Sequence, residues 1–393
     1  MIPVEKQRHT VYSGWFILML YATFVGLGLP DTGFGVAWNE MRLDFGAPLE
    51  AAGVIAATIT ATSALSAFSS ARVIQRFGYG KVTAVSVLMT AVAVIGFSIS
   101  PSFWFIVLFA VLLGLGAGSV DSGLNSFAAE NLSSRQMNWL HSAWGIGATV
   151  SPMMITFGIV SLGNWRLGYG MIGVVLLILV FVLVVTLPMW RHSSKKETES
   201  TATKKADRPA VQGIAPVLSV MTFVLYVAIE AGLGLWLSAL LIESRGLEVS
   251  LAGTLVGVYF GSIMAGRVLM GFLANWMGNR RLITLGLCIA ISGALLFLVP
   301  TTTYVYVVSI ILIGLGFAPL FPSLMHETTS RYPYWQARKI ISYQVSFSYI
   351  SVLLLVPLMG LLAGRVSLEV IPWITAGVIV ALWATVFNLN RLT

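Results

Sequence analysis

Long apolar runs without charge dominate the pattern of hydrophobic and polar positions along this chain. Four of them, Val82–Val120, Leu167–Trp190, Leu282–Met325 and Val370–Asn390, contain no Asp, Glu, Lys or Arg. A helix needs about 20 apolar residues to cross a bilayer, and two of these runs are long enough for two crossings. The pattern therefore predicts a protein that crosses a membrane many times.

Dividing the apolar runs at polar residues and at Pro or Gly breaks gives twelve predicted spans. They lie near residues 12–40, 50–75, 82–100, 103–129, 136–160, 167–190, 214–242, 250–276, 282–299, 304–326, 339–362 and 370–390. The predicted fold class is an all-α membrane protein with twelve transmembrane helices.

Basic residues predict the orientation of these spans. The N-terminus, the even-numbered loops and the C-terminus carry 18 Lys and Arg, whereas the odd-numbered loops carry only Arg42, Arg166, Arg245 and Arg365. Cytoplasmic loops of membrane proteins are enriched in Lys and Arg. We therefore expect a multi-pass protein of the cell membrane with both termini in the cytoplasm.

One hydrophilic segment divides the chain into two parts. Residues 191–213 contain nine charged residues together with Ser and Thr, a composition that cannot bury apolar surface. We expect an N-terminal six-helix bundle over residues 1–190, a cytoplasmic linker over 191–213 and a C-terminal six-helix bundle over 214–393.

Glycines recur in the two parts at an offset of 200 residues, which suggests two pseudo-symmetric bundles. The matched pairs are Gly46 and Gly246, Gly53 and Gly253, Gly78 and Gly278, Gly114 and Gly314, and Gly116 and Gly316. Internal repeats of six spans are the architecture of many secondary transporters, which bind substrate between the halves near the middle of the membrane.

Composition narrows the function further. The 393 residues are 57% hydrophobic and 10% charged, which excludes soluble enzymes and secreted disulfide scaffolds. The net charge of +8 arises from Lys and Arg in the predicted cytoplasmic segments, where they set the orientation of the spans, so no nucleic-acid partner is expected. No His pair has zinc spacing and no phosphate-binding loop is present, so we expect no enzyme activity, no metal and no cofactor.

Loop motifs resemble the major facilitator superfamily over the whole chain. The family's glycine-rich basic loop between spans 2 and 3 is matched weakly by Ala71–Lys81 and better, between spans 8 and 9, by Gly271–Arg281. Both copies lack the acidic residue of the motif, with Gln75 and Asn275 in its place. The gating residues implied are Arg76, Gly78, Gly278, Arg280 and Arg281, although glycines and basic residues also fit an ordinary tight turn near lipid headgroups.

Three further segments are similar to the fucose:proton symporter branch, which transports sugars. They are Gly114–Asn125 in span 4, His141–Ala148 in span 5 and Gly316–Ser323 in span 10. This resemblance implies a proton-coupling acid at Asp121 and a second acid at Asp31.

Ionisable residues inside the spans are the candidates for function, because each costs at least about 2.5 kcal/mol at a helix centre. Asp31 follows Pro30 in a glycine-rich stretch, so we expect span 1 to be bent or broken near its middle. Asp31 is a candidate for substrate binding and for proton coupling; the alternative is a cap on the second half-helix.

Asp121 and Asn125 are one helical turn apart, so both side chains can point into the same cavity. Burial disfavours the charged form of an acid, which allows Asp121 to load and release a proton. The alternative for Asp121 is a hydrogen bond between packed helices. Asn138, His141 and Trp144 share one face of span 5 and, with Asn125, are candidates for substrate binding. The ring of Trp144 offers a sugar a stacking surface, with lipid exposure or packing as the alternative, and His141 could instead bond a backbone carbonyl.

Span 7 is pseudo-equivalent to span 1 and carries Glu230 one position from the counterpart of Asp31. Glu230 is a candidate for substrate binding, with an ion pair to Arg267 as the alternative, and Gly232 and Gly234 suggest an irregular helix. In the same half, Trp236, Tyr259 and Gln344 are further substrate-binding candidates, whereas Arg267 is interpreted as structural.

The residues and the resemblance together predict a proton-coupled transporter that takes up a small polar solute such as a monosaccharide by alternating access. We expect a monomer whose partners are the solute, protons and the lipid bilayer. A proton-coupled exporter of amphipathic compounds and a non-transporting membrane sensor on the same fold are the alternatives. Sodium coupling and uniport also stay open.

Overall fold

The computed structural model describes residues 14–131, 134–193, 211–299 and 302–393. Its α-helices are α1 (Gly14–Thr32), α2 (Phe34–Phe45), α3 (Ala52–Phe77), α4 (Tyr79–Ile99), α5 (Phe103–Asn131), α6 (Ser134–Val160), α7 (Trp165–Val185), α8 (Ala215–Ala239), α9 (Val249–Met277), α10 (Asn279–Phe297), α11 (Thr303–Phe317), α12 (Leu320–Arg331), α13 (Tyr334–Arg365) and α14 (Val370–Leu392). Short 3-10 turns cover Leu49–Ala51 and Leu187–Ser193, and one π-helical turn covers Leu240–Ser244.

Twelve stretches of the described helices are long and apolar enough to cross a membrane, which confirms the predicted number of spans. Large apolar side chains such as Trp104, Phe181 and Trp373 are exposed, as expected where a helix faces lipid rather than water. The fold is therefore all-helical and suited to a bilayer.

Two predicted spans each consist of two helices. The first is interrupted at Gly33, three residues after Pro30, so the predicted break in span 1 is confirmed. The tenth is interrupted between α11 and α12 at Ala318 and Pro319. In span 7, by contrast, α8 runs unbroken through Gly232 and Gly234, so the predicted irregularity at these glycines is wrong. The π-helical turn follows only after Ala239.

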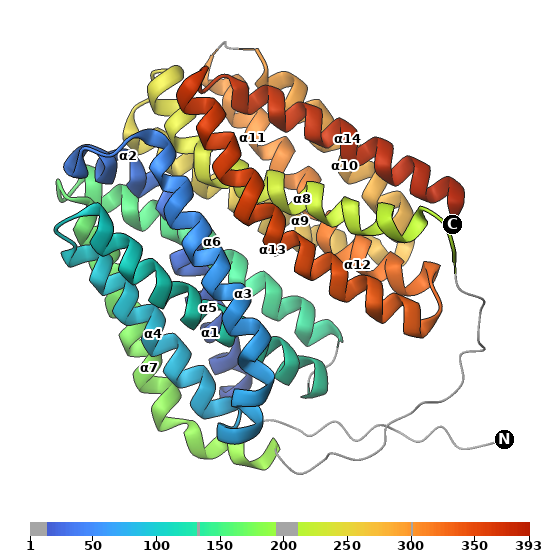
Figure 1. Cartoon of the computed structure of the whole chain (residues 1–393), viewed down its shortest axis with the longest axis horizontal. Helices are drawn as coiled ribbons and strands as arrows, with labels where there is room; N and C mark the ends of the chain where they lie inside the picture. The colour runs from blue at the N-terminus through green and yellow to red at the C-terminus, as the bar shows by residue number, and fades with distance from the viewer. Residues whose placement is uncertain (1–13, 132–133, 194–210, 300–301) are drawn as a thin grey trace.

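Helices α1–α7 pack mainly against one another, and so do α8–α14. Within the first group α1 packs on α6, and α5 packs on α3 and α4; within the second, α8 packs on α13 and α14, and α11 packs on α9 and α10. Figure 1 shows the blue and green helices as one group and the yellow to red helices as another. We call these groups the first and second halves. Residues 194–210 of the predicted linker lie outside the described residues, so the linker boundaries stay a prediction.

The halves touch each other through α6 and α9, α3 and α13, and α2 and α8. At the end of the molecule that carries α2, here called the α2 end, Asn39 donates a hydrogen bond to Ser238 over 2.9 Å and Arg42 pairs with Glu243 over 2.6 Å. In Figure 1 the two groups of helices converge near α2 and diverge toward the opposite end. The described cross-half polar contacts of Asn39 and Arg42 thus join the halves at the α2 end.

Each half also has an acid–arginine pair of its own at the α2 end. In the first half Arg166 binds Asp44 over 2.5 Å, and in the second half Arg245 binds Glu369 over 3.0 Å. Burial alone would raise the pKa of both acids, but hydrogen bonds from Trp165 and Arg166 hold the pKa of Asp44 below its ordinary value, and those from Arg245 and Ser244 do so for Glu369. Each acid therefore stays ionised beside its arginine at neutral pH.

Candidate functional site

The first acid of the candidate site lies where α1 meets α6. The indole Nε1 of Trp144 donates a hydrogen bond of 2.9 Å to the carboxylate of Asp31. The helices approach closely here because Gly28 has no side chain; a Cβ at Gly28 would collide with the backbone carbonyl of Trp144. Asp31 is exposed although Pro30 and Thr32 beside it are buried. Its carboxylate therefore faces a space that solvent can reach.

A second acid faces the same region from α5. Asn125 Nδ2 donates to Asp121 Oδ1 over 2.9 Å, so the two side chains lie on one helix face. Asp121 interacts electrostatically with Asp31, and Tyr349 of α13 interacts with both carboxylates. Tyr349 belongs to the second half, so the two acids of the first half lie close to the boundary between the halves.

His141 extends this region along α6. Its ring packs edge-on against Phe24 of α1, with ring centres 5.6 Å apart, and it interacts electrostatically with Arg267 of α9. The side chain of Asn138, the third residue predicted on this face, lies outside the part of the chain that the structure describes. Trp144 thus contacts Asp31, whereas His141, one turn earlier on α6, lies against Phe24.

The second half contributes an ion pair to the same region. Glu230 of α8 accepts from Arg267 over 3.4 Å, and the hydroxyl of Tyr226 lies 3.5 Å from the same guanidinium. The guanidinium also lies 5.8 Å from the ring of Trp144, which joins the two halves. Tyr259 donates to the backbone carbonyl of Glu230 over 3.1 Å. The predicted alternative for Glu230, an ion pair with Arg267, is what the structure contains.

Two predicted substrate-binding residues are instead engaged in helix packing. Trp236 is 1% exposed and donates to the backbone carbonyl of Val356 on α13 over 3.1 Å. Gln344 is also 1% exposed and bonds Ser219 and Thr328 over 2.9 and 3.0 Å. Their polar groups already have protein partners, so the structure does not bring either residue to the cluster formed by Asp31, Trp144 and Arg267.

Residues missed by the sequence analysis also belong to this cluster. Arg267 was interpreted as structural, yet it contacts both halves, and Tyr226, one turn before Glu230, was not singled out. The spacing of Tyr226 and Glu230 on one helix, four residues apart, was the available signal.

The predicted gating loops form two tight turns at the end opposite α2. Gly78 and Gly278 have φ angles of 82° and 75°, which side chains rarely adopt, so the predicted turns are confirmed. Arg280 donates to Glu327 over 3.0 Å, whereas Arg76 lies over the ring of Phe77 and Arg281 is exposed. Whether these residues gate transport stays a prediction.

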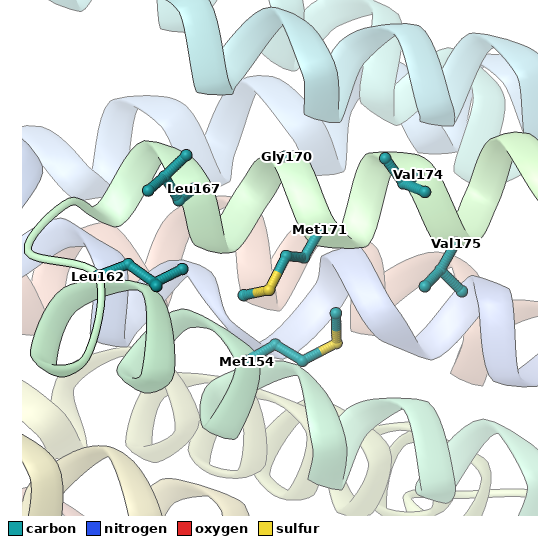
Figure 2. Close-up of a pocket in the computed structure, with 7 residues that line it drawn as sticks. All are labelled: Met154, Leu162, Leu167, Gly170, Met171, Val174 and Val175. Carbon is teal, nitrogen blue, oxygen red and sulfur yellow. The ribbon is translucent and has the colours of Figure 1, made fainter.

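A separate hollow lies between α6 and α7. Figure 2 shows Met154 of α6 facing Met171 and its neighbours on α7, with Leu162 at one end. The described residues that line it have no polar side chain, so they offer a polar solute no side-chain hydrogen bonds. The cluster of acids, aromatic rings and arginine is therefore the candidate site.

Chemically, this cluster combines two acids held by neutral donors, one acid held by a cation, and aromatic faces. We describe it as the central cluster, made of Asp31, Asp121, Asn125, His141 and Trp144 from the first half and Tyr226, Glu230 and Arg267 from the second. Such a set can hydrogen-bond a small polar molecule from both sides and can take up a proton.

Comparisons with known proteins concern the family and the fold of the chain. The family model described as Major Facilitator Superfamily matches residues 14–354. The glucose/mannose transporter GlcP of Bacillus subtilis (strain 168) is 23% identical over 259 residues, which is 63% of this chain and 63% of that protein. The cis,cis-muconate transport protein of Acinetobacter baylyi (strain ATCC 33305 / BD413 / ADP1) is 23% identical over 297 residues, 70% of each chain.

A solved structure supports the fold over nearly the full length. A point mutant of the nucleoside transporter NupG matches with a TM-score of 0.76 at 13% identity, covering 96% of this chain and 99% of that chain. At this identity the likeness concerns the fold alone. With the family model matching most of the sequence, the chain belongs to the major facilitator superfamily, a family of membrane transporters rather than enzymes.

Proposed function

We propose that the chain takes up a small polar solute, first of all a monosaccharide, in symport with protons and by alternating access. The observation that carries the proposal is the central cluster, in which Trp144 donates to Asp31 and its ring lies 5.8 Å from Arg267 of the other half, the partner of Glu230. A solute bound there would contact both halves, so its binding can be linked to their relative movement.

Proton coupling is supported by the partners of the two acids in the first half. Asp31 and Asp121 accept from Trp144 and Asn125, which are neutral donors. Either acid can therefore gain a proton without leaving a neighbouring cation unpaired. The resemblance to fucose:proton symporters also implies acids at these two positions.

A monosaccharide is supported by the chemistry of the cluster and by one relative. Sugars combine hydroxyls, which hydrogen-bond to carboxylates and guanidinium, with C–H faces that pack on aromatic rings such as Trp144. GlcP, a glucose/mannose transporter by name, is similar to this chain over part of its length. The segments that resemble the sugar-transporting branch lie on α5 and α6, which carry Asp121 and Trp144, and near the break between α11 and α12.

Alternating access is supported by the polar contacts at the α2 end and by the divergence of the helices at the other end (Figure 1). In our proposal the α2 end faces outward and both termini lie in the cytoplasm, as the distribution of Lys and Arg indicates. The structure would then correspond to a state closed to the outside.

Uptake into proteoliposomes tests the proposal. The purified protein is supplied in turn with D-glucose, D-mannose, a nucleoside, cis,cis-muconate and an amphipathic cation, with a pH gradient, a sodium gradient or no gradient. We expect a monosaccharide to accumulate when the exterior is acidic. Accumulation driven only by sodium would overturn proton coupling, expulsion of the amphipathic cation would favour the exporter, and failure to move any solute would favour a sensor.

A further inference from the structure

Arg267 is held much more loosely than Arg245, a structural arginine of the same half. The Arg267 guanidinium approaches Glu230 at 3.4 Å and Tyr226 at 3.5 Å, both at the outer limit of a hydrogen bond. Arg245 makes bonds of 2.8 and 3.0 Å to Phe297 and Glu369 through one nitrogen. Each of these two arginines has one buried nitrogen without a partner among the described residues. Arg245 also donates through Nε to Glu369 over 3.1 Å, so its bonds are both shorter and more numerous than those of Arg267.

The position of Arg267 is consistent with these long hydrogen bonds. Its guanidinium lies between Glu230 of its own half and the ring of Trp144 across the boundary, 5.8 Å away. A cation at that distance from an accessible ring gains little, about 0.5–1 kcal/mol. Arg267 can therefore exchange its present contacts for shorter ones to a ligand in the central cluster.

We propose that Arg267 binds two neighbouring hydroxyls of the solute and that Glu230 positions its guanidinium for this. The inference rests on the proposed function and names the residue of the second half that selects the solute. A guanidinium presents parallel N–H donors in a planar fork, which fits two oxygens side by side. Glu230 can accept a hydrogen bond from one of the same hydroxyls, so a neutral diol satisfies both members of the pair.

Charge favours a diol over a carboxylate as the ligand. Glu230 already balances the charge of Arg267, and the acids Asp31 and Asp121 lie on the facing half. An anionic solute would meet three acids and one arginine whose charge is already balanced, whereas a neutral polyol meets donors and acceptors only. The three acids around Arg267 thus favour a neutral polyol over a dicarboxylate such as muconate.

Binding of D-glucose and its single-deoxy analogues to the purified full-length protein tests this role. For the wild type we expect one or two analogues, lacking the hydroxyls that meet Arg267, to bind about tenfold more weakly than D-glucose. Arg267→Lys should bind D-glucose about tenfold more weakly and no longer distinguish those analogues, because a lysine cannot hold two oxygens in the same fork. Arg365→Lys, at the exposed end of α13, is the matched control and should behave as the wild type.

Several outcomes would overturn the inference. If Arg267→Lys binds D-glucose as the wild type does, or weakens binding but keeps the full preference over every analogue, Arg267 has only a structural role. If the wild type binds neither D-mannose nor D-glucose, the proposed function fails and the inference fails with it. Glu230→Asp, which keeps Arg267 but withdraws its acceptor, is measured in parallel. It should weaken the same preference, and it decides the question if Arg267→Lys does not fold.

Discussion

Carboxylates of the central cluster have different partners in the two halves. In the first half, Asp31 and Asp121 accept hydrogen bonds from Trp144 and Asn125, which carry no charge. In the second half, Glu230 faces the guanidinium of Arg267. An acid with neutral partners can exchange a proton freely, whereas protonating Glu230 would leave a buried cation unpaired. In our proposal the acids of the first half exchange protons as well as facing the solute, whereas Glu230 of the second half stays ionised and keeps Arg267 in place for the solute.

At the α2 end, by contrast, the acid of each half has an arginine as its partner. In the first half Asp44, near the end of α2, binds Arg166; in the second half Arg245, just after the π-helical turn, binds Glu369. Two residues earlier in each half stand Arg42 and Glu243, which pair with each other across the boundary. The two halves therefore meet at the α2 end through side chains of opposite charge, which attract each other.

The largest effect on this comparison is expected from Glu230→Gln. The substitution leaves Arg267 without its counter-charge, so we expect the affinity for the transported monosaccharide to fall about 10- to 100-fold, about 1.4–2.8 kcal/mol. Uptake at saturating solute should still respond to the pH gradient, because Asp31 and Asp121 are intact. If uptake no longer responded to the pH gradient while the affinity for the monosaccharide stayed unchanged, the roles proposed for the two halves would have to be exchanged.

A charge reversal at the α2 end should produce the next largest effect. Arg42→Glu places a second acid against Glu243, which costs about 1–2 kcal/mol and should increase opening of this end roughly tenfold. Opening is measured as the labelling rate of a cysteine at the buried Ser238, in a Cys288→Ser background, with a maleimide that does not cross membranes.

Two companion variants make that measurement specific. The double variant Arg42→Glu with Glu243→Arg restores an attractive pair and should return labelling to the starting rate. Asp44→Asn breaks a pair inside the first half only and should leave labelling nearly unchanged. Equal labelling in all variants would mean that the Arg42–Glu243 pair does not hold this end closed.

A smaller effect is expected at Trp144, the residue that contacts Asp31 and Arg267 at once. Trp144→Phe keeps an aromatic face but loses the donor to Asp31, so we expect about fivefold weaker binding, about 1 kcal/mol. Trp144→Ala also loses the ring and should weaken binding further, by about another 0.5–1.5 kcal/mol. Equal losses in both variants, measured by titration with the transported sugar, would assign Trp144 to packing.

Most of the fold could be predicted from the sequence because uncharged runs of sufficient length leave few alternatives to membrane spans. The number of spans and the break after Pro30 follow from hydropathy and from the missing N–H of proline. The break at Pro319 was missed although the same signal is present there. The π-helical turn at Leu240–Ser244 contains no Gly or Pro, so the sequence gives no signal for it.

The candidate site was only partly predictable for a physical reason. In a membrane helix the face toward lipid is as apolar as the face toward other helices, so hydrophobic periodicity does not identify the inner side. Trp236 and Gln344 were selected by residue type, yet their polar groups bond other helices. Charged residues predicted the site better, because exposing Asp31, Asp121 or Glu230 to lipid would cost several kcal/mol of free energy, so these side chains must face the protein interior.

The most direct test of the account is gradient-driven uptake by Asp121→Asn. Asparagine keeps the size of the side chain but cannot carry a proton. In proteoliposomes with an acidic exterior, accumulation of the monosaccharide should vanish, while exchange of labelled for unlabelled sugar without a gradient should persist and lose its dependence on pH. Asp31→Asn, by comparison, should also weaken binding. Full gradient-driven accumulation by Asp121→Asn would contradict the central claim that the neutral-partnered acid of α5 couples solute movement to protons.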